Sequence, residues 1–410
     1  MPKTIPSFVR KYRLPLLAAL CLVPTVINVI RYSFHIGEWW PSVHYFVGYD
    51  TGFGGRKLIG TICGWLFPDY VTGGVVTGIV LVANLLLLLL LLLFVLRTVK
   101  PGDAMTPVAA VLVLYVVQPF NVLQFCNRGM SAGFMETYQL VLTLGWLLLF
   151  LRWRGRWWYY LLTLLVAAAG CLIHHTFCCT LFPLFVALFV YDMTDGGFSV
   201  KKAVVYGLIC LAILSLFVSI WLFGHMNVDI DTLQADIVRR AAPDACGADK
   251  EALRQYYYDY GSNNVEGLQS LRIVEFVFSL LLMSPILAVF YWPWFAAARH
   301  SRQCRYWIVP VVITVLTIPV FLRTTDYTRW WICWFFGLMA LLLVVSHDGN
   351  LPLKEALERM WLFFKRRWYL AVLLLVYAAQ LYYISYEGLV PAIVLRNFLF
   401  GFTPYDSIVF

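Results

Sequence analysis

The chain has 410 residues, of which 61% are hydrophobic and 13% are charged, and it has a formal net charge of +9. Soluble domains carry about 25% charged residues, so this chain has too few charges to cover a water-facing surface of its size. The composition therefore excludes an ordinary soluble protein, and the meaning of the positive charge depends on where the basic residues lie.

A helix needs about 20 mostly apolar residues to cross a bilayer core of about 30 Å. We therefore expect an all-α polytopic membrane protein with about 11 transmembrane helices. The expected spans are 14–31, 75–96, 104–124, 135–151, 157–173, 176–191, 203–223, 273–295, 306–323, 330–346 and 368–386. The span 176–191 is short, and with its neighbour it fits a single interrupted hairpin equally well. The first span follows a basic stretch without a small-residue cleavage site, which predicts a retained helix.

The loops between these spans indicate the orientation, because cytoplasmic loops are rich in Lys and Arg. With the N-terminus inside, 19 of the 31 basic residues but only 6 of the 22 acidic residues fall on the inner side. We therefore predict an N-in, C-out topology in the plasma (inner) membrane. The net charge then reflects topology, and no nucleic-acid partner is expected.

We expect a single transmembrane domain over 1–386, followed by an outer C-terminal tail at 387–410. Its longest polar segments are two outer loops, 32–74 and 224–272. The segment 353–367 alternates apolar and charged residues at helical spacing, which predicts an amphipathic helix on the inner membrane surface. Long loops in compact proteins are usually functional or disordered, and the tyrosines at 256–260 favour order. The working side is therefore expected to be the outer one.

The first outer loop contains the main candidate for chemistry. Asp50 lies among four glycines between Gly48 and Gly55, and Arg56 and Lys57 follow directly. Glycines let a backbone approach a ligand closely, and successive amides form concavities for anions. We predict that Arg56 and Lys57 bind a phosphate or diphosphate while Asp50 acts as a base on an incoming hydroxyl. The alternative is a glycine-rich elbow in which Asp50 only pairs with Arg56.

Polar residues at other outer span ends are candidates for the same site. An imidazole of the pair at 174–175 could contact phosphate or move a proton, although capping of the span explains the pair equally well. The charged turn at 323–329 fits a polar headgroup or a structural ion pair, and Trp330 and Trp331 beside it indicate an interface belt. The candidate substrate-binding residues are Tyr49, Arg56, Lys57, Arg128, Glu136, His174, His175, Arg323, Asp326 and Arg329, with Asp50 as the candidate catalytic residue.

Several other kinds of site are not expected. The ten cysteines include no pair with metal-ligand spacing, so no metal site and no disulfide framework is predicted. A divalent metal is allowed but not indicated, and no cofactor is firmly implied. The Asp229-Ile230-Asp231 segment imitates the metal-binding element of soluble sugar transferases, but nucleotide sugars are normally absent from the outer side, so we treat it as chance. Acids are almost absent from the span interiors, which weighs against ion-coupled transport.

The order of these parts resembles the GT-C superfamily, the multi-span glycosyltransferases that use polyprenyl-phosphate sugars. The similar features are a cytoplasmic N-terminus, an acidic residue (here Asp50) in the first outer loop, and a second large outer loop after the seventh span. The segments 52–60, 174–177 and 325–330 also look like motifs of uncharacterised bacterial membrane proteins encoded among surface-polysaccharide genes. The resemblance covers about residues 1–295. The chain departs from several members in having one Asp where they carry paired acids, and in having no soluble C-terminal domain.

This resemblance implies an inverting transfer of a sugar from a polyprenyl-phosphate donor to a cell-surface glycan or lipid acceptor on the outer face. Asp50 would deprotonate the acceptor, while Arg56, Lys57, His174 or Arg329 would neutralise the leaving lipid phosphate. The expected partners are membrane lipid, the polyprenyl-linked sugar and the acceptor. Two alternatives stay open. One is an O-antigen-type polymerase acting on lipid-diphosphate-linked repeats and relying on arginines, and the other is a non-enzymatic carrier or flippase for a lipid-linked solute.

Overall fold

The computed structural model of the chain describes residues 23, 25–30, 40–99, 106–127, 133–246, 250–258, 273–323 and 327–381. Within these ranges the regular structure is helical, and the only β-type pairing is an isolated parallel bridge between Val71 and Ala241. Most of the first expected span, the candidate residues Arg128 and Asp326, and the expected tail at 387–410 lie outside the described residues.

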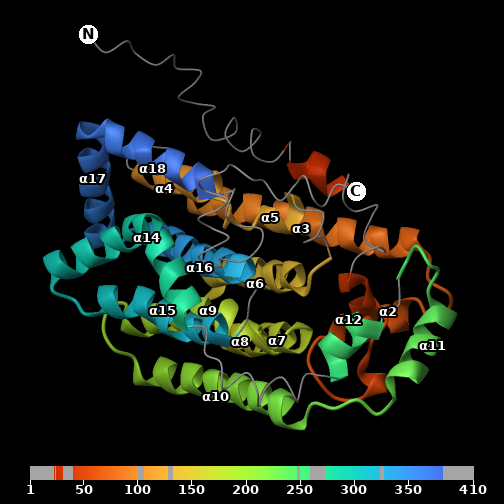
Figure 1. Ribbon diagram of the computed structural model, residues 1–410. Helices are drawn as coiled ribbons and strands as arrows, with labels where there is room; N and C mark the ends of the chain where they lie inside the picture. Colours follow the sequence, from red (N-terminus) through yellow and green to blue (C-terminus); the bar gives the residue numbers. More distant parts are fainter. Residues whose placement is uncertain are drawn as a thin grey trace.

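The helices pack side by side as one bundle (Figure 1). Their bounds are α2 (Leu58–Leu66), α3 (Gly73–Thr98), α4 (Thr106–Val117), α5 (Gln124–Asn127), α6 (Met135–Trp153), α7 (Trp157–Ile173), α8 (Phe177–Thr180), α9 (Phe182–Thr194), α10 (Val200–Phe223), α11 (Ile230–Arg240), α12 (Lys250–Leu253), α14 (Ile273–Ser301), α15 (Arg305–Arg323), α16 (Tyr327–His347), α17 (Leu351–Arg366) and α18 (Trp368–Gln380). Two short 3-10 turns, η2 (Trp40–Tyr45) and η3 (Tyr49–Thr51), precede α2, and a π-helical turn, η6 (Arg254–Tyr258), follows α12.

Five of the described helices are long and apolar enough to cross a membrane, namely α3, α10, α14, α15 and α16. Each of the other expected spans after the first contains a shorter or more polar helix, so the count of eleven remains a prediction. In the window 104–124 the helix α4 ends at Val117. The buried side-chain amide of Gln118 then donates to the Phe120 carbonyl, and that of Asn121 donates back to the Gln118 carbonyl. The window 176–191 is divided at Leu181 into α8 and α9.

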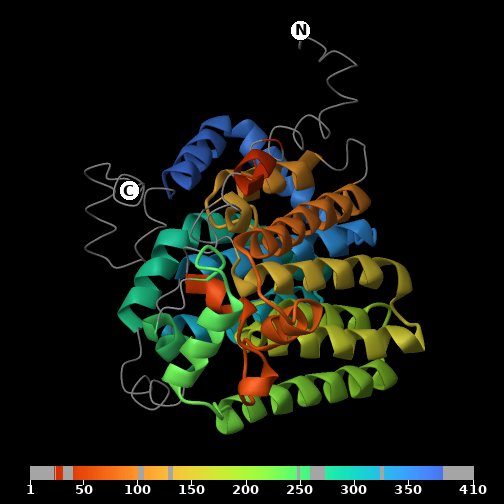
Figure 2. The ribbon, with the colours of Figure 1, turned by 90° about the vertical axis from the view of Figure 1, so that its right-hand side faces the viewer.

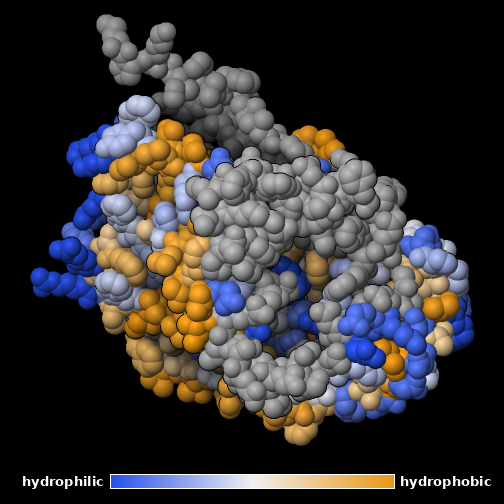
Figure 3. Space-filling view, viewed as in Figure 1, coloured by the Kyte–Doolittle hydropathy of each residue, from blue (hydrophilic) through white to orange (hydrophobic). Residues whose placement is uncertain are grey.

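Polar and apolar surface is distributed as a membrane protein requires. Figure 3 shows hydrophobic residues left of centre and along the lower edge of the face it draws, and hydrophilic residues at the left and right ends. The helix α17 stands across one end in Figure 1, while α2, α11 and α12 lie at the opposite end, which Figure 2 turns toward the viewer. The chain is therefore a helical, membrane-embedded protein with a polar assembly at each end.

The helix α16 is the centre of the bundle, and almost all of its residues are buried. Trp331 and Trp334 stack with their ring centroids 4.8 Å apart. Trp330 and Trp331 are 2% and 0% exposed, so the prediction that they form an interface belt is wrong. A belt requires a helix that faces lipid, and α16 is surrounded by α3, α4, α9 and α15.

The end that carries α17 is held together by ion pairs. Asp192, buried at the end of α9, accepts from Lys202 at 3.0 Å and from the Tyr206 hydroxyl at 2.9 Å. Arg154 bonds Asp348 and also approaches Asp192. Basic residues that were assigned to the inner side for reasons of topology thus also link four helical segments.

The amphipathic helix expected at 353–367 forms as α17. Asn350 caps its first turn by accepting from the Leu353 amide. Its apolar residues Leu353, Leu357 and Met360 are buried, and the helix packs against α14. The apolar face of α17 therefore contacts the bundle in addition to any contact with lipid.

Candidate functional site

The glycine-rich loop that carries Asp50 is folded into two tight turns. The Thr51 hydroxyl and amide both bond the Gly48 carbonyl and close the turn η3. Gly52 has a φ of 131°, which residues with a Cβ atom rarely adopt, and a Cβ there would lie 2.4 Å from the carbonyl oxygen of His225. The loop therefore depends on glycine at position 52 for its conformation and for its contact with the second outer loop.

The described parts of the loops 32–74 and 224–272, far apart in sequence, are joined by main-chain hydrogen bonds. The amides of His225 and Asn227 donate to the carbonyls of Phe53 and Thr51 at 2.8 and 2.9 Å. A second contact forms around Val71, whose amide donates to the Arg240 carbonyl at 2.7 Å and whose carbonyl accepts from Ala242 at 2.9 Å. The described parts of the loops 32–74 and 224–272 thus form a single assembly at one end of the bundle.

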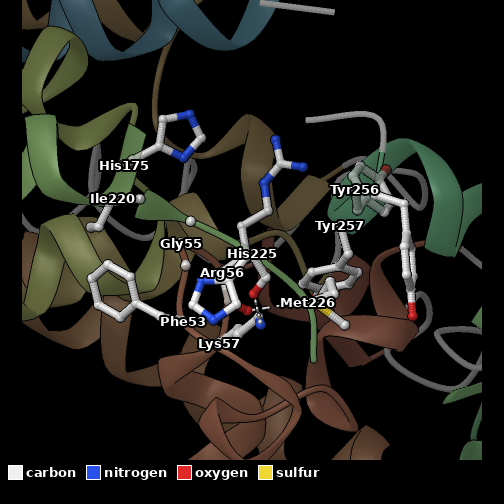
Figure 4. A pocket seen from close by; sticks show the side chains of 13 residues that line it. Phe53, Gly55, Arg56, Lys57, His175, Ile220, His225, Met226, Tyr256 and Tyr257 are labelled. Atoms are coloured by element: carbon white, nitrogen blue, oxygen red, sulfur yellow. Dashed lines mark hydrogen bonds between the residues drawn. The ribbon is translucent and has the colours of Figure 1, made fainter. Parts of the chain in front are cut away.

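A cavity of about 230 Å³ lies between these loops and the end of α10 (Figure 4). Its described lining residues are Phe53, Gly54, Gly55, Arg56, Lys57, His175, Ile220, Gly224, His225, Met226, Tyr256, Tyr257 and Tyr258. Arg56 and Lys57 are the arginine and lysine of this lining, and none of the described lining residues carries a carboxylate. Burial lowers the pKa of His175 to about 3, so its imidazole is neutral. Such a lining favours an anionic ligand that also has surface for aromatic contact.

Arg56 is held in place by an imidazole and an aromatic ring. It has a φ of 66°, unusual for a residue with a side chain. Its guanidinium lies 4.9 Å from the Tyr256 ring centroid, and its Nε–H donates to Nε2 of His174 at 3.0 Å. Within the described chain its terminal amino groups have no hydrogen-bond or ion-pair partner. A strained backbone and an uncompensated cation at a cavity wall are typical of a functional residue.

His174 accepts from Arg56 because its ring is neutral. Its other ring nitrogen, Nδ1, lies 2.7 Å from the Thr176 hydroxyl and 3.2 Å from the Thr176 amide nitrogen. Burial, and secondarily the charge of Arg56, holds the pKa of His174 well below 6.5. The carbonyl of His174 accepts from the Gln139 amide at 2.7 Å. His174 therefore fixes the orientation of Arg56 and adds no positive charge.

Lys57, the N-cap residue of α2, is a buried cation. It is 1% exposed, and its ammonium makes one long hydrogen bond, 3.4 Å, to the His225 carbonyl. Burial lowers the pKa of Lys57 from 10.5 to about 8, and the nearby negative charge of Asp50 partly offsets this effect. Lys57 is therefore mostly charged at pH 7, although the protein compensates its charge only weakly.

Asp50 lies at the edge of this arrangement. Its side chain is exposed, it is not among the described lining residues of the cavity, and it forms no ion pair with Arg56 or any other described residue. The simple pairing of Asp50 with Arg56, considered above as the alternative to function, is therefore absent. The preceding residue, Tyr49, points its ring inward, and burial raises its pKa to about 12.

A second charged pair lies close to His174. Arg329, in the first turn of α16, donates to Glu136 at 3.0 Å and packs over the Phe134 ring at 4.6 Å. Glu136 is fully buried, and its second carboxylate oxygen has no hydrogen-bond partner among the described residues. The charge of Arg329 contributes to the lowered pKa of His174, which places the two in one electrostatic neighbourhood. Arg323, the last residue of α15, is not linked to this group by any described contact.

Several residues of the site were not predicted as members. His44 lies in η2, and its Nδ1 is 2.7 Å from the Tyr257 hydroxyl, although the two residues are 213 positions apart. Burial keeps the pKa of His44 well below 6.5. His225 and the tyrosines at 256–258 form part of the wall. The dense run of tyrosines could have indicated a wall of the cavity, but in the sequence alone it predicts only an ordered loop.

Metal binding receives no support from the described residues, which contain no cluster of three or more His, Cys, Asp or Glu side chains able to hold an ion. Asp229 is the N-cap of α11, where it accepts from the amides of Asp231 and Thr232. This capping role accounts for the Asp-x-Asp segment without a metal.

Comparison with known proteins adds no relative to this description: no family model, no curated protein and no solved structure matches the chain.

Proposed function

We propose that the protein is a membrane-embedded transferase that takes a sugar from a lipid carrier, to which the sugar is linked through phosphate, and passes it to a cell-surface glycan or lipid acceptor. One observation carries the proposal. Arg56 and Lys57 face a cavity at the end of an apolar helical bundle, and neither has a carboxylate partner within the described chain. An uncompensated cation is costly to bury, so the cavity favours a ligand that supplies negative charge.

The position of the cavity suits a lipid-linked ligand. The lining includes Ile220 and Gly224 from the end of α10, a helix whose other residues are largely exposed on the apolar surface. A prenyl or similar tail would stay in the bilayer beside α10 while its phosphate reaches Arg56 and Lys57. Tyr258 and Phe53 offer apolar surface against which a sugar ring can pack. The aqueous acceptor would approach from the loop side.

In this reaction the acceptor hydroxyl loses its proton to a base, its oxygen forms a bond to the anomeric carbon of the sugar, and the bond from that carbon to the phosphate oxygen breaks. Asp50 is the proposed base, because it is a carboxylate on the same loop as the two cations and within electrostatic reach of Lys57. Arg56 and Lys57 would neutralise the charge that develops on the departing phosphate.

The test is sugar transfer by purified protein in vesicles that contain a labelled prenyl-phosphate sugar. Asp50→Asn should reduce transfer at least about 100-fold, the usual contribution of a general base, and should leave the melting temperature unchanged. Asp69→Asn is the matched control, since Asp69 is an exposed aspartate of the same outer loop that does not line the main cavity. Full transfer by Asp50→Asn would remove Asp50 from the mechanism.

A polymerase that joins lipid-diphosphate-linked repeats is the second candidate function. It is favoured by the basic character of the described cavity lining, which contains no carboxylate. In that case Arg56→Gln should abolish product formation while Asp50→Asn retains it, and the products should be chains of repeats instead of singly modified acceptors.

A further inference from the structure

Arg56 and Lys57 are adjacent in sequence but point in different directions. Figure 4 shows the Arg56 guanidinium between His175 and Tyr256, whereas the Lys57 side chain runs toward the main chain of His225. The left-handed backbone at Arg56, with φ of 66°, produces this divergence at the start of α2. The two side chains therefore form two separate cationic centres in one cavity.

Each centre has hydrogen-bond donors to spare. Arg56 uses only its Nε–H, so the four N–H groups of its terminal nitrogens have no partner within the described chain. The ammonium of Lys57 has three N–H donors, of which one makes a 3.4 Å bond to a carbonyl. Lys57 is 1% exposed, so bulk water satisfies these donors poorly. The negative charge of Asp50 offsets the burial of Lys57 only in part, so both centres favour an acceptor with negative charge.

A ligand with one phosphoryl group compensates one of these centres and leaves the other unpaired at a desolvated wall. Two phosphoryl groups in tandem present one anionic group to each side. The cavity wall also includes Gly54 and Gly55, whose backbone a ligand can approach without meeting a side chain at these two positions. We propose that the cavity binds a lipid-linked diphosphate, with one phosphoryl group on Arg56 and the other on Lys57. This inference rests on the proposed function and specifies its substrate class.

The experiment compares two lipids that differ in the number of phosphoryl groups, together with pyrophosphate, which lacks the lipid tail. Binding of farnesyl phosphate, farnesyl diphosphate and inorganic pyrophosphate to the full-length protein in detergent is measured by calorimetry at pH 7. Farnesyl diphosphate should bind at least about tenfold more tightly than farnesyl phosphate, because a second charge-assisted contact contributes about 1.5 kcal/mol or more. Pyrophosphate should bind more weakly than farnesyl diphosphate, since it lacks the tail.

Substitution of either cation should remove this preference. In Arg56→Gln and in Lys57→Gln the affinity for farnesyl diphosphate should fall to about that for farnesyl phosphate. Lys201→Gln is the control and should keep the preference, because Lys201 is exposed and lies in the first turn of α10, whereas the cavity borders the last turn of that helix. Raising the pH from 7 to 9 should also weaken the preference in the unmodified protein, because the pKa of Lys57 is about 8.

The outcomes separate the two levels of the argument. Equal binding of farnesyl phosphate and farnesyl diphosphate by the unmodified protein would overturn the diphosphate inference and leave the phosphate site intact. Failure of both lipids to bind would overturn the proposed function as well. Pyrophosphate binding as tight as that of farnesyl diphosphate would show that the tail contributes nothing, and would refute a lipid-linked ligand. The comparison within the unmodified protein does not depend on the folding of any variant.

Discussion

Replacing Lys57 with methionine should stabilise the fold while it weakens ligand binding. Lys57 is 1% exposed, and burial lowers its pKa from 10.5 to about 8. One pKa unit corresponds to about 1.4 kcal/mol, so the charged form costs the folded protein roughly 3 kcal/mol. Methionine has a similar length and no charge, and it adapts to irregular spaces. Because the cavity admits some solvent, we expect Lys57→Met to raise the free energy of unfolding by about 1–3 kcal/mol at pH 7.

The gain should depend on pH in a defined direction. The pKa of Lys57 in the folded protein, about 8, lies below the ordinary value of 10.5, so between these values the unfolded chain binds more protons than the folded one. The stability of the unmodified protein therefore rises with pH across this window. The advantage of Lys57→Met should be complete below about pH 8, shrink above it, and vanish near pH 10.5.

Thermal unfolding in detergent at pH 7 and pH 9.5 measures the effect, and for a chain of this length the expected gain corresponds to roughly 1–4 °C. Lys202→Met supplies a contrast, because Lys202 pairs with the buried Asp192 at 3.0 Å and its loss should lower the melting temperature. A lower melting temperature for Lys57→Met at pH 7, or a gain that is the same at both pH values, would refute the reasoning.

Three further predictions concern the surroundings of the cavity. Gly52→Ala should destabilise the protein by about 2 kcal/mol or more, because Gly52 has a φ of 131° and a Cβ there would lie 2.4 Å from a carbonyl oxygen. Gly64→Ala is the control, since Gly64 has open space around it; equal melting temperatures for the two variants would contradict the prediction. Glu136→Ala removes the fully buried carboxylate that accepts from Arg329 and should cost about 1–3 kcal/mol by denaturant unfolding; the pair removed together should cost less than the two single losses combined. Because the folded-state pKa of His174 lies below 6.5, the unfolded chain binds more protons in acid, so stability should fall as the pH drops below about 6.5, and His174→Asn should flatten that fall in melting curves.

The sequence was sufficient to predict the helical membrane class, because apolar run length acts locally along the chain. Helices occupy the expected windows after the first, and the glycine-rich loop, Arg56, Lys57 and His175 do meet at one cavity. His174 joins them through its bond to Arg56. Arg56 and Lys57 are adjacent in the glycine-rich loop, so their proximity in sequence already indicated part of the site.

The remaining features depend on tertiary contacts that local patterns do not encode. The divergence of Arg56 from Lys57 follows from a left-handed backbone at a residue other than glycine. The contact of His44 with Tyr257 joins segments 213 residues apart. Trp331 is of a residue type common at membrane interfaces, but it lies at the centre of the bundle. Its burial depends on the helices that surround α16, which the local sequence does not specify. Periodicity identifies an apolar helix and leaves open whether it faces lipid or protein.

Part of the junction between the loops 32–74 and 224–272 is formed by main-chain atoms alone. The amides of His225 and Asn227 meet the carbonyls of Phe53 and Thr51, and a glycine at position 52 allows the approach. None of these bonds depends on the identity of the side chains at 53, 225 or 226, yet all three of those side chains border the cavity. In these residues the main-chain atoms hold the loops together, while the side chains border the ligand cavity. An engineer can therefore diversify these three positions in a library, keep Gly52 fixed, and search for new specificities on an unchanged scaffold.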